Sequence, residues 1–443
     1  MRNKVGLISL GCAKNLVNSE QMLYLLQQAG YDVFGGSAEE ISRADAVIIN
    51  TCGFIESAKM EAIETILEIA EEKKAGNVRA IVVAGCLAER YKDELLKEMP
   101  EIDAVVGVGS FTDIVEAVTA ALEGKPFQRF ADINLPDPET DRILSTPAGS
   151  AYLKIAEGCD NRCAYCAIPD IRGRFRSRPM ESVLAEAERL AARGVKELIV
   201  VAQDTTRYGL DLYGRRRLAE LLEALCRIEG LVWIRLHYLY PDEIDDALID
   251  VVAREEKIVK YLDIPIQHIS DKILRAMRRR GTKQEIVALF RKIRERIPGV
   301  VLRTSLITGL PGEGEEEFEE LCAFLREAKI ERAGVFPYSP EEGTPAAEMD
   351  YPPPDVARRR AELIAEIQYG IMDAFNKSRV GKVETVLVEG RRGRYMYGRS
   401  GAESPDIDGV VLFTGGRPAP GEFVRVRITG EKDGDVVGEM VKP

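Results

Sequence analysis

Short apolar runs alternate with amphipathic stretches through the first 130 residues. Residues 5–10, 46–50 and 80–84 are typical of buried strands, while 19–29 and 55–73 have the apolar spacing of helices. Strands that alternate with helices predict a parallel sheet with helices on both faces. In such a sheet the loops after the strands lie along one edge and line the ligand crevice.

The same alternation continues in the middle of the chain. Six further apolar runs are predicted as strands, at residues 151–155, 197–202, 232–238, 261–264, 301–307 and 333–338. Six strands with helices between them fit a full or partial (β/α) barrel, whose active site lies at the carboxyl ends of the strands. A charged helical stretch at 354–377 follows.

The last 65 or so residues change to alternating polar and apolar positions. Four strand-like runs, separated by Gly and Pro turns, stand at 383–389, 394–399, 409–413 and 423–430. This pattern is typical of a small antiparallel β-barrel. We therefore expect an α/β protein with four parts: an N-terminal α/β/α sheet domain (1–133), a proline-containing linker (134–149), a central barrel (150–376) and a C-terminal β-barrel (377–443).

Composition limits the environment and the partners. The chain has 443 residues, of which 45% are hydrophobic and 30% charged, as in ordinary globular proteins. It shows no signal peptide and no apolar run of about 20 residues, so we expect a cytoplasmic protein without a membrane partner. There, eight cysteines are expected to be ligands or core residues rather than disulfides. The net charge of −12 argues against broad binding to nucleic acid, and no DNA partner is expected.

One cysteine motif, C-x3-C-x2-C, directly follows the first strand predicted for the barrel. Its members are Cys159, Cys163 and Cys166. Three thiolates around a cube of four irons leave one iron open to bind a small molecule. A structural zinc site would need four ligands, and no fourth Cys or His lies nearby. Zinc and a plain electron-transfer cluster are the alternatives.

A second set of cysteines is spread over the N-terminal segment. Cys12, Cys52 and Cys86 each follow a predicted strand and each have a glycine beside them. Loops at one edge of a sheet converge, and glycines let the backbone approach a bulky inorganic group. The alternative is that cysteine packs as a small apolar side chain, which we expect for Cys226 and Cys322 on apolar helical faces. For the first three we expect a second cluster with an open iron.

The C-x3-C-x2-C motif is similar to that of the radical S-adenosylmethionine (SAM) enzymes. With the second cysteine set before it and a small β-domain behind it, the chain resembles the methylthiotransferase family over almost its whole length. The resemblance implies a methylthiotransferase domain, a radical SAM barrel and a TRAM domain. It also implies two [4Fe-4S] clusters and SAM as cofactors: Cys159, Cys163 and Cys166 would hold the SAM-cleaving cluster, and Cys12, Cys52 and Cys86 the auxiliary cluster.

Several motifs resemble the branch of this family that modifies a ribosomal protein. They are residues 11–15, 155–160, 164–169, 202–205, 263–268 and 405–409. The implied reaction adds a methylthio group to the β-carbon of an aspartate in the twelfth protein of the small ribosomal subunit, free or assembled. An electron donor such as flavodoxin or ferredoxin, and a sulfur donor, would be further partners. The alternatives are a tRNA adenosine methylthiotransferase and a non-catalytic iron–sulfur protein that binds RNA or ribosomes.

The chemistry of such a reaction requires a cofactor. No acid or base in a protein removes hydrogen from an unactivated carbon, so a radical is needed and the cofactor supplies it. The resemblance implies two uses of SAM, one to methylate a sulfur held at the auxiliary cluster and one to generate the radical at the barrel cluster. This pairing would explain two clusters that each have an open iron.

Four residues are expected to contact SAM. Gln203 and Asp204 follow a predicted barrel strand, although Asp204 is equally well placed to cap a helix. Gly309 lies in a Gly/Pro turn similar to the adenine-contacting segment of the superfamily. Arg172, or alternatively Arg178, would pair with the SAM carboxylate because a guanidinium group binds carboxylates through two N–H groups. The alternative is that these arginines lie on a solvated face.

Two further observations bear on the site and the substrate. The only histidines, His237 and His268, end apolar strands and fit either a pocket wall or the core. From Lys377 onward the chain carries 12 Lys and Arg against 10 Asp and Glu, whereas a dedicated RNA-binding domain is expected to be more basic. This mild balance, with Asp406 and Asp408 in one loop, favours a basic protein partner over tRNA.

Overall fold

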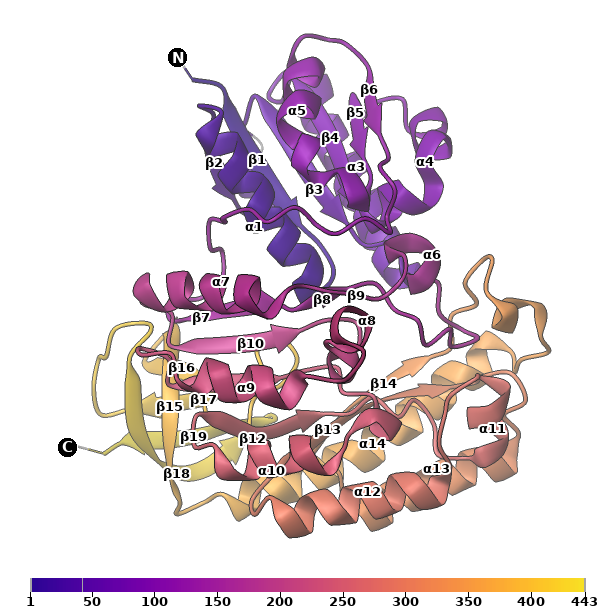
Figure 1. The fold of residues 1–443 in the computed structure, drawn as a ribbon, viewed down its shortest axis with the longest axis vertical. Coiled ribbons are helices and arrows are strands. Elements are labelled where there is room, and N and C mark those ends of the chain that lie inside the picture. The colour runs from indigo at the N-terminus through magenta and orange to yellow at the C-terminus, as the bar shows by residue number, and fades with distance from the viewer. Residues whose placement is uncertain (1, 42, 442–443) are drawn as a thin grey trace. The chain divides into compact units, whose positions relative to one another are not determined.

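The computed structural model describes residues 2–41 and 43–441, which form two units built from separate segments of the chain (Figure 1). Unit 1 consists of Met1–Ser145, Ala156–Arg178 and Ser339–Ala347. Unit 2 consists of Thr146–Ile155, Pro179–Tyr338 and Glu348–Pro443. The segment with the C-x3-C-x2-C motif therefore packs with the N-terminal domain, although the sequence analysis places it in the central barrel. The predicted four-part division stays a prediction.

Unit 1 contains a six-stranded sheet in which every neighbouring pair is parallel. Its order is β2-β1-β3-β4-β5-β6, and the strands are β1 (Lys4–Ser9), β2 (Asp32–Gly35), β3 (Ala46–Thr51), β4 (Ala80–Gly85), β5 (Ala104–Val106) and β6 (Phe127–Arg129). The three central strands are the ones that the apolar runs predict. The other three have only three or four residues each, too few to show a strand pattern in the sequence.

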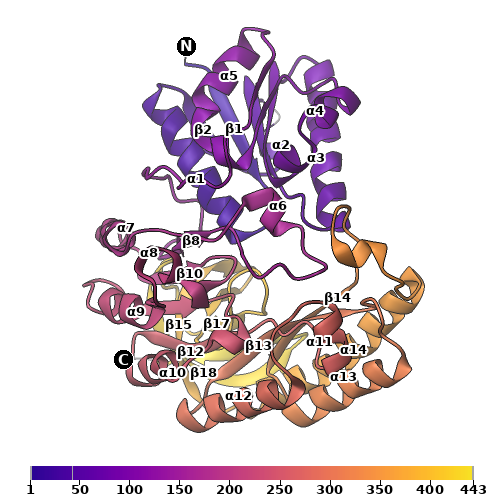
Figure 2. The same ribbon diagram turned by 45° about the vertical axis from the view of Figure 1, so that its right-hand side comes forward.

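Helices cover both faces of this sheet, as predicted (Figure 2). Successive residues of β3 point to opposite sides: Val47 and Ile49 pack in one core cluster with α3 and α4, while Ile48 packs in the other with α1 and α5. The helices of unit 1 are α1 (Ala13–Gln28), α2 (Ala38–Ile41), α3 (Glu56–Lys74), α4 (Cys86–Glu98), α5 (Ile114–Leu122), α6 (Ile168–Arg172) and the 3₁₀ turn η1 (Val108–Asp113). A two-stranded antiparallel ribbon completes the unit, formed by β8 (Ala156–Glu157) and β9 (Arg176–Ser177).

Unit 2 contains a second six-stranded parallel sheet, in the order β14-β13-β12-β11-β10-β7. Its strands are β7 (Ser150–Lys154), β10 (Glu197–Val201), β11 (Trp233–Leu236), β12 (Ile258–Asp263), β13 (Val301–Thr308) and β14 (Arg332–Pro337). Within the described residues the sheet ends at β14 and β7, so the partial form of the predicted barrel is the one present. All six strands match predicted runs.

Helices alternate with these strands along the chain, which is why the strands run parallel. They are α7 (Met180–Ala192), α8 (Leu210–Tyr213), α9 (Leu218–Cys226), α10 (Asp246–Arg254), α11 (Asp271–Ala276), α12 (Lys283–Arg296), α13 (Glu315–Ala328) and α14 (Pro354–Ser378). Short 3₁₀ turns of unit 2 are η2 (Thr205–Arg207) and η3 (Pro241–Glu243), while η4 (Pro345–Glu348) lies where the chain passes from the last segment of unit 1 back to unit 2. No helix in the described part of the chain is both long and apolar enough to span a bilayer.

The C-terminal part of unit 2 is a closed five-stranded barrel in the order β15-β16-β17-β19-β18. Its strands are β15 (Val383–Arg392), β16 (Tyr395–Arg399), β17 (Val411–Thr414), β18 (Phe423–Lys432) and β19 (Asp435–Met440). Val386, Phe413 and Ile428 are among its buried core residues. The sequence predicts four of the five strands but misses β19. The pairing of β17 with β19 is parallel, and the other pairs are antiparallel as predicted.

Buried ion pairs fasten this barrel to the six-stranded sheet within unit 2. Glu197 of β10 accepts from Arg235 Nε at 3.0 Å and from Arg399 Nη2 at 2.6 Å. Burial opposes ionisation of Glu197, but the two guanidinium groups outweigh it and hold the pKa at about 2. A second buried carboxylate, Glu403, pairs with Arg332 at 3.1 Å and with Arg379.

The two aspartates of the C-terminal loop also lie in this contact. Asp406 accepts from the hydroxyl of Tyr152 at 2.9 Å, and Asp408 accepts from the hydroxyl of Tyr261 at 2.7 Å. Both carboxylates are thus used inside unit 2. Asp406 is nonetheless exposed and Asp408 is half-exposed, so the interpretation that connects them with a basic protein partner stays a prediction.

Candidate functional site

Three neighbouring strands of unit 1 each end next to a cysteine. Cys12 caps α1 after β1, Cys52 follows β3, and Cys86 is the first residue of α4 after β4. Because β1, β3 and β4 are adjacent and parallel, their carboxyl ends meet at one edge of the sheet. The equivalent positions that the sequence predicts for these cysteines are present in the structure.

The glycines beside the cysteines show how closely the loops converge. A Cβ on Gly11 would lie 2.8 Å from Cβ and 3.2 Å from Sγ of Cys52. A Cβ on Gly53 would lie 2.9 Å from the carbonyl carbon of Cys86. Gly11 also has a φ of +86°, a value that side chains rarely tolerate. Glycine is therefore required here because Gly11 packs against the Cys52 side chain and Gly53 packs against the backbone of Cys86 and Leu87.

The three thiols influence one another electrostatically. Burial raises the pKa of Cys52 to about 11, and the neighbouring Cys86 and Cys12 sulfurs add to this. Burial also raises the pKa of Cys86 despite the nearby Arg172 charge. At Cys12 burial acts in the same direction but is outweighed by the charges of Lys14 and Arg172, so its pKa is lowered.

Three thiols on converging loops are the kind of donor set that an iron–sulfur cluster takes, and a cluster held by Cys12, Cys52 and Cys86 stays a prediction. Among residues 2–41 and 43–441, no three Cys, His, Asp or Glu side chains are grouped as ligands of one ion. In an iron–sulfur cluster each thiolate binds a different iron. The three sulfur atoms therefore need to lie near one another without being ligands of the same metal atom. The glycine-lined approach of the Cys12, Cys52 and Cys86 loops provides such an arrangement.

Arg172, at the end of α6, lies beside this cysteine set. Its side chain is only 1% exposed. Nε donates to Sγ of Cys86 at 3.3 Å, Nη1 to Oε2 of Glu157 at 2.8 Å, and Nη2 to Oδ1 of Asn15 at 3.1 Å. The predicted contact of Arg172 with the SAM carboxylate stays a prediction; each of its three nitrogens is engaged by groups of unit 1.

The motif cysteines Cys159, Cys163 and Cys166 lie in the loop between β8 and α6. The backbone N–H of Cys159 donates to the carbonyl of Gly173 at 3.1 Å, which closes the loop. Gly158, with a φ of +77°, approaches the chain so closely that a Cβ would lie 2.0 Å from the Arg174 carbonyl oxygen. The sequence signature therefore coincides with a tight loop that is held at its two ends by the β8–β9 ribbon.

The other predicted SAM contacts lie in unit 2. Asp204 is buried and its carboxylate accepts from the backbone N–H of Thr206 at 3.1 Å, so it caps η2, as the alternative interpretation proposes. Gln203 is half-buried next to it. Gly309 directly follows β13 and has a φ of +76°, and a Cβ there would lie 2.3 Å from Cβ of Ala357. Contacts of these residues with SAM remain predictions.

Both histidines are buried and have partners. Nδ1 of His268 accepts from the N–H of Ser270 at 3.0 Å, and its Nε2 faces Glu313 at 3.3 Å. His237 Nε2 lies 2.7 Å from the hydroxyl of Ser404. This favours the core interpretation of the two histidines.

Three other residues that the sequence analysis singled out, Arg178, Cys226 and Cys322, lie at structural positions. Arg178 forms a two-point ion pair with Glu139, with distances of 2.9 and 2.6 Å. Cys322 is buried as expected, whereas Cys226 at the end of α9 is only half-buried, because it is the last residue of its helix.

Sequence reasoning missed Glu157 and Asn15 as partners of Arg172. Asn15 lies in the motif after Cys12, and Glu157 stands two residues before Cys159. Their positions beside the cysteines are the only signal in the sequence. Asn15 also donates through Nδ2 to the carbonyl oxygens of Leu10 and Asn50, at 2.8 and 3.2 Å, and so joins two of the cysteine loops.

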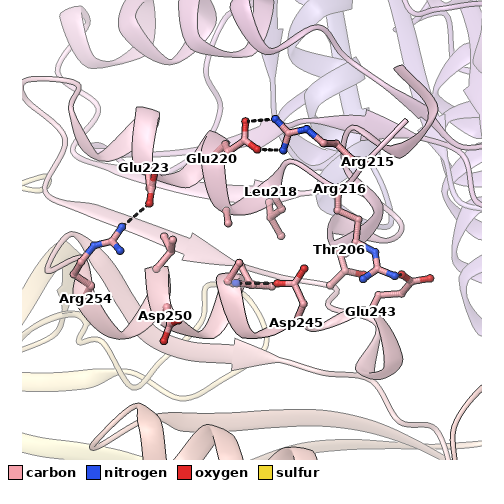
Figure 3. A pocket seen from close by; sticks show the side chains of 14 residues that line it. Thr206, Arg215, Arg216, Leu218, Glu220, Glu223, Glu243, Asp245, Asp250 and Arg254 are labelled. Carbon is pink, nitrogen blue, oxygen red and sulfur yellow. Dashed lines mark hydrogen bonds and ion pairs between the residues drawn. The ribbon is translucent and has the colours of Figure 1, made fainter. Parts of the chain in front are cut away.

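A pocket of about 370 Å³ lies between α9 and α10 of unit 2 (Figure 3). Its charged side chains largely pair with one another, as in the Arg254–Glu223 pair at 2.5 Å and the pair of Arg215 with Glu220. None of the residues predicted for the cofactors lines it. The pocket is therefore not part of the candidate site.

Comparison with known families assigns each part of the chain. Residues 4–107 match the uncharacterized protein family UPF0004, residues 153–325 the radical SAM superfamily, and residues 380–441 the TRAM domain. Among solved structures, the radical SAM methyltransferase TsrM from Kitasatospora setae is similar with a TM-score of 0.56 and 17% identity. The similarity covers 77% of this chain and 74% of TsrM, and at this identity it supports the fold alone.

Whole-length relatives narrow the assignment. The chain is 53% identical over 444 residues to the ribosomal protein uS12 methylthiotransferase RimO of Pelotomaculum thermopropionicum, with 99% of each chain covered. It is 50% identical over 455 residues to the protein of the same name from Acetivibrio thermocellus, covering 100% of this chain and 99% of the relative. Membership of the radical SAM superfamily implies SAM and a [4Fe-4S] cluster as cofactors. By its sequence over the full length and by its three domains, the chain belongs to the RimO family of radical SAM methylthiotransferases.

Proposed function

We propose that this protein adds a methylthio group to the β-carbon of an aspartate in uS12, the twelfth protein of the small ribosomal subunit. The relatives that share about half of its residues over the full length carry this substrate in their names. The observation that carries the proposal is the convergence of Cys12, Cys52 and Cys86 at one sheet edge. A radical SAM enzyme that only cleaves SAM needs no such second cysteine set.

The two cysteine sets fit two [4Fe-4S] clusters. Cys159, Cys163 and Cys166 would hold one, leaving an iron for SAM, and Cys12, Cys52 and Cys86 the other, leaving an iron for sulfur. When bound, these cofactors supply the methyl group, the sulfur and the radical that an unactivated C–H bond requires.

The chain's own residues bind and orient these groups. The six cysteines provide thiolates, and the glycines at 11 and 53 keep side chains out of the space between the loops. Lys14 and Arg172 supply positive charge next to Cys12, which favours its thiolate form. Gln203, Asp204 and Gly309 are proposed SAM contacts, in keeping with their positions after strands of the unit 2 sheet. Arg172, whose three nitrogens have partners within unit 1, is a proposed SAM contact by the family resemblance alone.

The proposed partners follow from the reaction. uS12, free or in the subunit, is the substrate, and the reaction would take place in the cytoplasm, where small subunits assemble. Cleavage of SAM needs one electron, so a flavodoxin- or ferredoxin-type donor is required. A sulfur donor is a further partner if the auxiliary cluster does not supply its own sulfur.

The test is anaerobic reconstitution followed by an assay on a peptide with the candidate aspartate loop. Wild type is expected to bind about eight irons and the Cys12/Cys52/Cys86→Ala variant about four. With SAM and dithionite, only wild type should give the peptide a mass gain of about 46 Da, as expected when –SCH3 replaces hydrogen.

The other outcomes point to different functions. 5′-Deoxyadenosine formed beside an unmodified peptide, with modification of tRNA in a parallel reaction, would make the protein a tRNA adenosine methylthiotransferase. A fully loaded protein that forms no deoxyadenosine would contradict both enzymatic functions and favour a non-catalytic iron–sulfur protein.

A further inference from the structure

The guanidinium group of Arg172 donates a hydrogen bond to a cysteine sulfur, Sγ of Cys86, at 3.3 Å. It is almost completely buried, so its charge is not screened by water. Its Nη1 ion-pairs with Glu157, and its Nη2 is fixed by Asn15. Nε–H is then aimed at the sulfur of Cys86 by the orientation that the other two contacts impose.

The guanidinium group of Arg172 has one carboxylate partner and acts electrostatically on all three thiols of the N-terminal cysteine set. Glu157 alone neutralises the guanidinium charge. When Cys12, Cys52 and Cys86 bind iron they become thiolates, because metal ligation requires the deprotonated sulfur. Lys14 is the other cation that acts on Cys12. Arg172 and Lys14 thus oppose the negative charge of a loaded site, and Arg172 also hydrogen-bonds to a thiol sulfur.

The chain position of Arg172 links the two cysteine sets. Arg172 ends α6, whose N-cap Ala167 directly follows Cys166. Glu157, its ion-pair partner, stands two residues before Cys159. The Arg172–Glu157 pair therefore closes the C-x3-C-x2-C loop across its base, while Nε of the same arginine contacts the other cysteine set at Cys86.

We infer that Arg172 is a positioning residue for the auxiliary cluster: it holds the sulfur of Cys86 and tunes the reduction potential of the cluster bound there. This inference rests on the proposed function, in that Cys12, Cys52 and Cys86 hold a cluster. Hydrogen bonds to cluster sulfurs and nearby positive charge both favour the reduced form, so they raise the reduction potential.

The inference is tested in full-length protein whose Cys159, Cys163 and Cys166 are changed to Ala, so that only the auxiliary cluster is present. In this background Glu157→Gln is compared with Glu157→Gln/Arg172→Gln. The two differ only at Arg172, and the paired change avoids leaving Glu157 as an uncompensated buried charge. The readouts are iron per chain, the rate of iron loss to a chelator, the electron paramagnetic resonance spectrum and the midpoint potential.

Removal of Arg172 is expected to shift the midpoint potential to a more negative value, to change the spectrum and to speed iron loss several-fold. Arg172→Lys, which retains the charge but loses the planar donor group, is expected to lie between the two. An unchanged midpoint potential and spectrum in the Arg172→Gln protein would overturn the inference.

A matched control separates this role from the general cost of removing a buried ion pair. Arg142 and Glu20 form such a pair in the same unit at 2.5 Å, with no sulfur contact among the described interactions. Arg142→Gln/Glu20→Gln should leave the potential unchanged. If the Arg172 variant loses its iron while circular dichroism matches this control, Arg172 holds the cluster as inferred.

Failure of the proposed function gives a different result. If the background protein with Arg172 intact binds no iron at all, the three N-terminal cysteines hold no cluster, and the proposed function fails together with the inference. If it binds about four irons, the cluster assignment stands and the Arg172 comparison alone decides the inference.

Discussion

Two buried arginine networks, one in each unit, use the same residue types for different ends. In unit 2, Arg235 and Arg399 share Glu197, and the remaining donors of Arg235 go to the backbone carbonyls of Ser400 and Gly401. In unit 1, Arg172 pairs with one carboxylate and one amide and gives its last nitrogen to the sulfur of Cys86. Burial of an arginine therefore does not by itself mark a functional residue; the chemistry of its acceptors does.

The networks also differ in what balances their charge. Glu197 and Glu389 match the charges of Arg235 and Arg399 at neutral pH, so the unit 2 network is complete in the protein alone. The unit 1 network lies beside three thiols, all of which become thiolates when they bind metal. We therefore expect changes in unit 2 to affect stability and changes in unit 1 to affect the cofactor.

The largest expected effect follows from removing the sulfur atoms of the unit 1 network. The Cys12/Cys52/Cys86→Ala protein should lose methylthio transfer completely, because no ligand remains for the auxiliary cluster, while the thermal midpoint of the metal-free protein changes little. Peptide mass spectrometry and thermal unfolding measure the two quantities. Deoxyadenosine formation should persist, and methylthio transfer by the triple variant would refute the assignment of this cysteine set.

Breaking the unit 2 network should be costly for stability. Glu197→Gln leaves two buried guanidinium groups without their shared carboxylate, and we expect a loss of about 3 to 5 kcal/mol in the free energy of unfolding. Urea unfolding of the full chain followed by circular dichroism measures this loss.

The control for this prediction is Arg254→Gln, which removes an exposed pair with Glu223 and should cost less than about 1 kcal/mol. Equal effects of the two substitutions would contradict the distinction between a buried network and a surface pair. Neither variant should alter the iron content of the reconstituted protein, since both positions lie in unit 2.

Acid should weaken unit 2 through the same carboxylates. The pKa values of Glu197 and Glu403 are both lowered to about 2 from an ordinary 4.5. A carboxylate whose pKa is lowered by folding stabilises the folded state at pH values above its pKa in the unfolded chain. This stabilisation is lost as the pH falls through its pKa in the folded state. The thermal midpoint should therefore fall as pH drops from about 4.5 towards 2, less steeply in Glu197→Gln. An acid limb of unchanged slope in that variant would contradict this assignment.

The smallest predicted effect distinguishes the thiols of unit 1 from one another. The pKa of Cys12 is lowered, whereas that of Cys52 is raised to about 11, although both residues are half-buried. Because the thiolate is the reactive form, iodoacetamide at pH 7.5 should alkylate Cys12 in the metal-free protein several-fold faster than Cys52. Peptide mapping over time measures both rates. Cys226, whose pKa is also raised to about 11, serves as the slow reference.

The sequence is informative where chemistry depends on local pattern. Cys12, Cys52 and Cys86 could be grouped because each follows a run of buried apolar residues and has a glycine at a position where the loops later touch. The central strands of both sheets are readable for the same reason. The short strands β5 and β6 and the last strand β19 are not, since β5 and β6 have only three residues each and β19 combines six residues of mixed polarity, so that each carries little periodic signal.

The partners of Arg172 could not be read from the sequence. Asn15 lies 157 residues away, and the contact depends on the packing of α6 in unit 1 rather than in the barrel. The alternating arginines of that segment are compatible with a solvated face and with a carboxylate-binding site. Asp406 and Asp408 show the same limit, because their tyrosine partners lie on strands more than 140 residues away.

The division of unit 1 into three segments has a consequence for the order in which the protein is made. At about 5 to 20 residues per second, residue 347 is synthesised roughly 10 to 40 s after residue 145. Until then the growing N-terminal sheet lacks Glu341, the buried carboxylate that pairs with Lys59 and Arg90 in the finished unit. The cysteine-bearing unit thus begins first on the ribosome and is completed late, only after most of the barrel has been synthesised.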